Sequence, residues 1–244
     1  MSFIITLYTR EGIVMASDSR LTLNAEIVKP DGQRSTLAAG MSDSNYKTFL
    51  AQNRIGISTY GQADIKGAPI GGFIETFIRE NLSDTLSVTE FANELNEHFR
   101  TFDPIPDTGF HIAGYEETDN GLKQMVYQVA PFHNLVQVNN PDTPNGESSQ
   151  GATWGGEGDI LARLLQPVYT KDANGNYQEL PQFQIPWQFF TLQDAIDFAV
   201  YAIQTTIDSV RFLPRAKTVG GPIDVLVIKP TETLWISRKE LARN

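Results

Sequence analysis

The order of the periodic segments in this chain of 244 residues is the feature that most restricts its fold. β-rich stretches come first, and two segments with helical spacing, more strands, two further helical segments and a final strand pair follow them. The order differs from the strict strand–helix alternation that indicates a parallel sheet. Segregated strands and helices are typical of α+β proteins whose sheets are mainly antiparallel. No internal repeat or break in composition divides the sequence, so we expect a single domain over residues 1–244.

The expected elements follow from apolar spacing and from turn residues. The predicted strands are residues 2–9, 12–18, 46–50, 54–59, 109–116, 122–138, 223–228 and 234–237. The predicted helices are residues 65–80, 87–102, 159–169 and 191–210. Ser87 with Glu90 three residues later forms a capping-box pattern, and Asn174-Gly175 is a hairpin turn signal. Residues 24–44 are polar and rich in Gly and Ser, which predicts a loop.

Composition excludes several classes of function. The net charge of −10 disfavours non-specific binding to nucleic acid or to an anionic membrane, because both need basic patches. The absence of cysteine excludes disulfides and thiol catalysis. The apolar runs are too short for a membrane span or a signal peptide, so we expect a cytoplasmic protein. The three histidines are isolated and lack a metal-ligand spacing, and we expect neither a metal nor another cofactor.

The residue after the initiator methionine is the first candidate for chemistry. Ser2 becomes the N-terminal residue if Met1 is removed, and a serine at this position usually permits that removal. The free α-amine could then take the proton from the attacking hydroxyl oxygen. An unperturbed α-amine titrates close to neutral pH, which suits a base. A serine in second position is common, so Ser2 alone is not specific.

Three segments of the chain resemble proteasome-type N-terminal nucleophile hydrolases, in particular bacterial proteasome β-subunit-like proteins. Counting back from Asp18 places Ser2 where this family has its nucleophilic threonine, and the spacing from Lys47 to Gly61 also fits. The segments are Gly12-Ile-Val-Met-Ala-Ser-Asp-Ser-Arg20, Asn45-Tyr46-Lys47 with Ile55–Asp64, and Gly220-Gly221-Pro222 with Ile223–Ile228. The resemblance covers the order of elements over nearly the whole chain.

The resemblance implies a four-layer αββα sandwich, in which two antiparallel sheets lie between helix pairs. It also implies hydrolysis of amide bonds, of peptides in particular, with Ser2 as nucleophile and its α-amine as general base. Lys47 would adjust the pKa values of these groups, and Asp18 would orient Lys47. Gly61 would offer its backbone N–H to the developing oxyanion.

The resemblance also implies substrate contacts and assembly. The family residues that match Thr22 and Ala63 pair with the substrate backbone as an added strand. By position alone, Leu21, Asn45 and Thr59 are predicted to line the substrate pocket. Self-association into a ring or helical homo-oligomer is expected, whereas an ATPase partner and the substrate preference cannot be read from the sequence.

The sequence departs from the family pattern at several positions around the expected site. Gly156 or Glu157 stands where the family has a supporting serine, and Val219 stands before Gly-Gly where another serine is usual. Asp208 and Ser209 are about two residues out of register with the family pair near the end of the fourth helix. Two alternatives therefore stay open: a catalytically inactive assembly protein with this fold, and a hydrolase of small-molecule amides.

Overall fold

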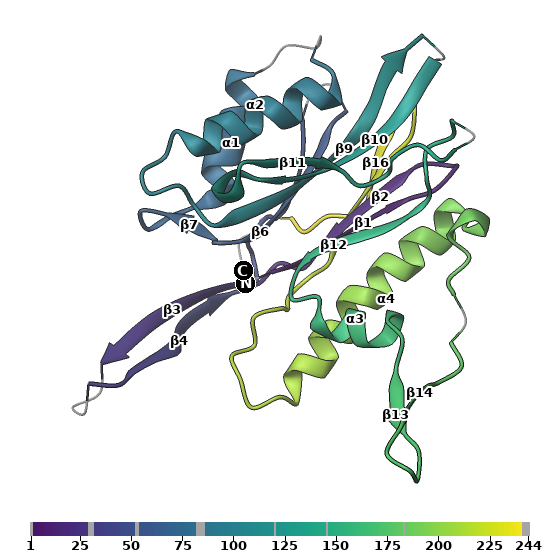
Figure 1. Cartoon of the computed structure of the whole chain (residues 1–244). Coiled ribbons are helices and arrows are strands. Elements are labelled where there is room, and N and C mark those ends of the chain that lie inside the picture. Colours follow the sequence, from purple (N-terminus) through teal and green to yellow (C-terminus); the bar gives the residue numbers. More distant parts are fainter. Residues whose placement is uncertain are drawn as a thin grey trace.

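The computed structural model describes residues 2–28, 32–51, 54–81, 86–119, 121–144, 146–182 and 184–240. Antiparallel strand pairs and α-helices make up the regular structure of this part of the chain (Figure 1). Its α-helices are α1 (Ile70–Glu80), α2 (Val88–Arg100), α3 (Asp159–Leu165) and α4 (Leu192–Arg211). The prediction of an α+β chain with antiparallel sheets is confirmed. Over the same residues, no helix is long and apolar enough to cross a membrane.

One five-stranded sheet has the order β12-β1-β2-β15-β16. Its strands are β1 (Phe3–Tyr8), β2 (Ile13–Ser17), β12 (Gly151–Gly156), β15 (Asp224–Ile228) and β16 (Thr233–Ser237). Helices α3 and α4 pack on one face of it (Figure 1). There Phe3 and Ile5 belong to the same apolar cluster as Ala195 and Ala199. Every residue of β1 and β2 is buried, which fixes the two strands that lead into the N-terminal region.

A second five-stranded sheet has the order β11-β10-β9-β6-β5. Its strands are β5 (Thr48–Leu50), β6 (Gly56–Gly61), β9 (Thr108–Thr118), β10 (Gly121–Ala130) and β11 (Leu135–Val138). Helices α1 and α2 cover it through a second apolar cluster that includes Phe77, Phe91 and Phe110. The short strands β7 (Asp64–Ile65) and β8 (Ala68–Pro69) connect β6 to α1.

A third apolar cluster joins the two sheets. It brings Ile13 and Met15 of β2 together with Ala113 of β9 and Val126 of β10. Gly56 of β6 permits this close approach, because a Cβ atom there would lie 2.4 Å from the sulfur of Met15. The cluster therefore packs residues of the two sheets against each other.

The helix starts predicted at Ser87 and Thr191 are confirmed, whereas the helix predicted over residues 65–80 begins only at Ile70 and the one predicted over 159–169 ends at Leu165. At the start of α2, the Ser87 hydroxyl accepts a hydrogen bond from the Glu90 N–H (3.1 Å), and the Glu90 carboxylate accepts one from the Ser87 N–H (2.9 Å). Thr191 and Asp194 form the same reciprocal pair at α4. Each cap satisfies N–H groups that would otherwise lack partners at a helix start, which typically contributes about 1 kcal/mol.

The predicted loop over residues 24–44 is wrong. The chain there forms a hairpin of β3 (Leu21–Val28) and β4 (Arg34–Ser42), which projects from the body of the molecule (Figure 1). Apolar residues do alternate with polar ones along β3, at Leu21, Leu23, Ala25 and Ile27, which is a strand pattern. The loop prediction instead followed the polar residues and the Gly and Ser content of the segment as a whole. On the hairpin, Leu23, Val28 and Met41 are exposed.

Other predicted boundaries shift where proline or a short connection intervenes. The predicted strand 122–138 divides at Pro131, because proline lacks an N–H for the ladder, and the 3₁₀ helix η1 (Pro131–His133) lies between β10 and β11. The hairpin predicted at Asn174-Gly175 is confirmed as β13 (Tyr169–Lys171) paired with β14 (Tyr177–Glu179). A second 3₁₀ helix, η2 (Trp187–Phe189), precedes α4.

A buried histidine between the sheets makes stability depend on pH. His111 of β9 lies within hydrogen-bond distance of Thr6 of β1 (Nδ1 to Oγ1, 3.0 Å), and burial lowers the pKa of His111 from 6.5 to about 3. Between these values the unfolded chain binds a proton that the folded chain does not, so stability is complete above pH 6.5 and falls as the pH falls toward 3. The expected slope is up to about 1.4 kcal/mol per pH unit.

Urea unfolding between pH 7.5 and 4 measures this dependence. We expect His111→Asn, which keeps a partner for Thr6, to flatten the slope, and the exposed control His133→Asn to leave it unchanged. Equal slopes for the wild type and His111→Asn would show that the buried imidazole does not cause the effect.

Candidate active site

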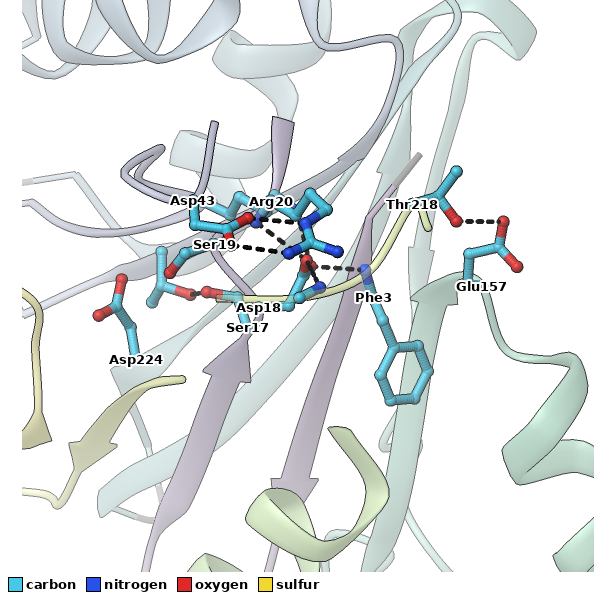
Figure 2. A network of polar contacts seen from close by, with 12 residues as sticks. Phe3, Ser17, Asp18, Ser19, Arg20, Asp43, Glu157, Thr218 and Asp224 are labelled. Carbon is cyan, nitrogen blue, oxygen red and sulfur yellow. Dashed lines mark hydrogen bonds and ion pairs between the residues drawn. The ribbon is translucent and has the colours of Figure 1, made fainter. Parts of the chain in front are cut away.

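A buried aspartate at the end of β2 organises the N-terminal region (Figure 2). One carboxylate oxygen of Asp18 accepts hydrogen bonds from the Phe3 N–H (2.9 Å) and from the Lys47 ammonium (2.6 Å). The other oxygen accepts from the backbone N–H groups of Arg20 (3.1 Å) and Gly220 (3.0 Å). Asp18 therefore joins segments that lie far apart in the sequence, and all four of these hydrogen bonds are charge-assisted.

The lysine partner is as enclosed as the aspartate. The side chain of Lys47, directly before β5, is only 2% exposed. Burial lowers the pKa of Lys47, because removing the ammonium from water penalises its charged form, while the carboxylate of Asp18 opposes this effect. The positive charges of Lys239 and Arg20 lower the pKa of Lys47 further. Lys47 and Asp18 thus form an ion pair in which both side chains are almost fully shielded from solvent.

Ser2 lies directly before β1 and is buried. Its carbonyl oxygen accepts a hydrogen bond from the Glu157 N–H at 2.8 Å. Gly156 has a positive φ of 88°, and a Cβ atom there would lie 1.8 Å from the Ser2 carbonyl oxygen, so glycine is required. Phe3, the residue after Ser2, donates its N–H to Asp18, which also binds Lys47. Ser2, Asp18 and Lys47 therefore lie at the same end of the sheet that contains β1 and β2.

Glu157 itself forms a second network, and Figure 2 shows its carboxylate joined to Thr218. Its carboxylate accepts hydrogen bonds from Arg215 (2.7 Å) and from the Thr218 hydroxyl (3.0 Å), and its side chain is 7% exposed. The sequence left open which of Gly156 and Glu157 would support the site, and both contact the backbone of Ser2. Asp208 lies elsewhere, because it is exposed on α4 and accepts a hydrogen bond from Gln204.

The sequence did not reveal a bidentate ion pair that flanks the aspartate. Arg20 donates to both carboxylate oxygens of Asp43, each at 2.7 Å, and this pairing lowers the pKa of Asp43. Gly220 leaves room for the guanidinium, because a Cβ atom there would lie 2.4 Å from the Arg20 Cζ. The sequence shows Arg20 only as part of the Asp18-Ser19-Arg20 motif. Its partner Asp43 lies in the segment that is predicted to be a loop.

Gly61 is the last residue of β6, a strand of the second five-stranded sheet. It has a positive φ of 93°, and a Cβ atom there would lie 2.7 Å from the Asp107 carbonyl oxygen. Its neighbour Tyr60 packs against Gly155, where a Cβ atom would lie 2.4 Å from the Tyr60 ring, and Gly155 precedes the glycine that contacts Ser2. The end of β6 therefore lies beside the end of β12, at the same edge as Ser2.

A cavity of about 510 Å³ opens beside Gly61. Of the predicted substrate-binding residues, Leu21, Thr22 and Ala63 line it. Thr59 does not line this cavity, since it is buried and its hydroxyl lies 3.2 Å from that of Thr108. Asn45 is likewise not part of the lining, and its N–H donates to the Ser19 carbonyl (3.2 Å). The structure thus gathers three of the predicted contacts at one opening.

No protein-family model and no curated protein sequence matches this chain. Its structure is similar to that of Anbu from Hyphomicrobium sp. strain MC1, with a TM-score of 0.58 over 98% of this chain and 88% of that chain. The two sequences are 15% identical. At this identity the likeness shows a shared fold and carries no information on activity.

These comparisons correct the assignment to bacterial proteasome β-subunit-like proteins. A solved structure that the fold matches is that of Anbu, and no family model supports the three segments that suggested the assignment. Those segments are short and consist of the strands β2, β6 and β15 with their flanking turns, so they follow the geometry of the fold more than membership of one family. What the comparisons support is the likeness of fold.

Proposed function

We propose that this chain hydrolyses amide bonds, with peptides as substrates, and that Ser2 acts as an N-terminal nucleophile once Met1 has been removed. Met1 itself lies outside the described residues. The observation that carries the proposal is the shared carboxylate of Asp18, which accepts from both the Phe3 N–H and the Lys47 ammonium. The carboxylate of Asp18 therefore holds the buried Lys47 ammonium close to Phe3, the residue that follows the proposed nucleophile Ser2.

In the proposed reaction the Ser2 hydroxyl oxygen attacks the carbonyl carbon of the substrate amide, and its proton passes to the α-amine of Ser2. The C–N bond then breaks, the proton goes to the leaving amine, and an ester links the acyl group to Ser2. Water attacks this ester, and the α-amine again takes the proton and returns it to the serine oxygen. Carboxylic acid and free enzyme result.

The surrounding residues have distinct roles in this proposal. The positive charge of Lys47 lowers the pKa of the α-amine and favours the alkoxide, while Asp18 orients Lys47. The backbone N–H of Gly61 stabilises the oxyanion of each tetrahedral intermediate. The hydrogen bond from the Glu157 N–H to the Ser2 carbonyl holds the nucleophile in place.

The proposal also covers the domain arrangement, the substrate contacts and the self-association of the chain. We expect residues 1–244 to form one domain with a four-layer αββα arrangement, because helix pairs cover the outer faces of two packed sheets. Thr22 and Ala63 would pair with the substrate backbone as an added strand, with the 510 Å³ cavity beside them. Self-association into a ring or helical homo-oligomer would bury exposed apolar side chains such as Phe189 and Phe212.

A leader that can be cut off tests the requirement for a free amine. The protein is produced behind a leader domain that a specific protease removes directly before Ser2, and hydrolysis of fluorogenic peptide amides is measured before and after cleavage. We expect turnover to rise at least about 100-fold on cleavage, because the uncleaved protein lacks the general base. Protein with the leader removed and then acetylated at the new N-terminus is the control, and it should return to the low rate.

Two results would count against the proposal. Equal turnover with and without the leader would show that the α-amine of Ser2 is not the base. A lack of turnover after cleavage, across peptide and small-molecule amides alike, would favour the alternative of an inactive assembly protein.

A further inference from the structure

The cavity beside Gly61 is acidic. Asp64 and Asp107 both contribute to its wall. The remaining wall consists of apolar, glycine and uncharged polar residues: Leu21, Thr22, Leu23, Gly61, Gln62, Ala63, Gly67 and Pro69. No lysine, arginine or histidine is among these described lining residues. A substrate group that enters the cavity therefore meets two carboxylates and no cation.

The two aspartates are held in place through a turn and through their backbone. One carboxylate oxygen of Asp64 accepts a hydrogen bond from the Gly67 N–H (3.0 Å), which shapes the turn between β7 and β8. The carbonyl of Asp107 accepts from the Gln62 N–H (2.8 Å), and its N–H donates to the Gln62 side chain (3.1 Å). Across the described ranges, neither carboxylate forms an ion pair with a basic side chain of this chain.

A third polar group of the wall lacks a partner. Thr22 is 7% exposed, and its buried hydroxyl oxygen makes no hydrogen bond with the described residues. A buried hydroxyl without a partner is costly, which suggests that a bound molecule supplies one. The unpartnered hydroxyl of Thr22 is an observation independent of the two aspartates, and Thr22 lines the same cavity.

From these three side chains we infer that the cavity binds a cationic group of the substrate, an ammonium or guanidinium near the amide to be cleaved. Such a group offers N–H donors to the carboxylates of Asp64 and Asp107 and to the Thr22 oxygen. A guanidinium fits best, because it presents five donors in a planar fork. The net charge of −10 also favours the approach of a cationic substrate. This inference rests on the proposed hydrolase function.

Matched peptide amides that differ only in charge test the inference. One series carries arginine at the first, second or third residue on the acyl side of the scissile bond, and the other carries citrulline, which has a similar shape without the charge. We expect arginine at one of these positions to raise kcat/KM by roughly five- to tenfold, as expected for one or two partly exposed ion pairs. Added salt should reduce this ratio, because it screens the charges.

Variants assign the preference to the cavity. Asp64→Asn retains an oxygen that can accept from Gly67, so the turn should persist, and the double variant Asp64→Asn/Asp107→Asn should bring the ratio of arginine to citrulline close to one. Asp197→Asn, on the exposed face of α4, makes one of the same charge changes away from the cavity and should leave the ratio intact. An unchanged ratio in the double variant would overturn the inference.

Binding to an inactive variant separates this inference from the hydrolase proposal. Calorimetry of the arginine and citrulline peptides with Ser2→Ala measures the preference without turnover. Preferential binding of arginine that disappears in Asp64→Asn/Asp107→Asn supports the acidic cavity even if no amide is cleaved. Equal binding of the two peptides would overturn it, whether or not the wild type is active.

Discussion

Replacement of Ser2 by alanine is expected to reduce amide hydrolysis by at least about 10³-fold, because the variant has an α-amine but no hydroxyl to attack the substrate. The fold should persist, since the contacts that hold residue 2 involve its backbone: the carbonyl accepts from the Glu157 N–H, and the following N–H donates to Asp18. Initial rates with fluorogenic peptide amides measure the loss, and thermal unfolding confirms that the variant is folded.

Ser2→Thr is the matched variant for this prediction. It keeps a hydroxyl beside the α-amine, so we expect it to retain measurable turnover, at a rate set by how well the added methyl group fits the buried position. Hydrolysis by Ser2→Ala at the wild-type rate would rule out Ser2 as the nucleophile. Turnover by Ser2→Thr no higher than that of Ser2→Ala would contradict the expectation that a hydroxyl beside the α-amine is sufficient for activity.

Loss of one partner of the Asp18–Lys47 pair is expected to affect both activity and stability. Lys47→Met removes the ammonium and leaves Asp18, which is fully buried, without its nearest counter-charge. Breaking a buried ion pair in this way typically costs about 3–5 kcal/mol of folding stability. Hydrolysis should fall at least about 100-fold, because the α-amine and hydroxyl lose the charge that adjusts their pKa values. Urea unfolding and initial rates measure the two effects.

The control for this pair is an ion pair on the surface. Arg10 and Glu147 lie 3.3 Å apart with side chains that are 67% and 69% exposed, so Arg10→Met should change stability by less than about 1 kcal/mol. Asp18→Asn/Lys47→Met should be less destabilised than the sum of the single variants, because the two residues interact directly. Additive effects, or a change for Lys47→Met as small as for Arg10→Met, would contradict the role of the buried pair.

The sequence predicts the elements that bury an apolar face, and it predicts the exposed hairpin of β13 and β14 only through its Asn174-Gly175 turn signal. Helix α2 begins directly after the predicted Ser87 capping box, α4 begins within one residue of its predicted start, and β1 and β2 lie within the predicted ranges. The hairpin of β3 and β4 was missed although Leu21, Leu23, Ala25 and Ile27 alternate with polar residues, because the polar content of residues 24–44 favoured a loop. The close approach of the sheets at Gly56 could not be predicted either, since it depends on which residue faces the glycine.

The candidate site could be predicted only as far as spacing along the chain determines it. Asp18 and Lys47 were named from the sequence, and the structure places them 2.6 Å apart, whereas their catalytic roles stay predictions. The partners that come from distant segments were not visible: Asp43 on Arg20, and Arg215 and Thr218 on Glu157. Thr59 was assigned to the pocket by position, but its side chain points to a hydroxyl contact with Thr108 instead.

The most direct test of the central claim is the intact mass of the purified protein before and after treatment with a β-lactone that acylates nucleophilic hydroxyl groups. We predict that Met1 is absent, that one molecule of the reagent adds per chain, and that peptide mapping places it on Ser2. Ser2→Ala should take up none. A protein that retains Met1, or that binds the reagent at a residue other than Ser2, would contradict the assignment of Ser2 as an N-terminal nucleophile.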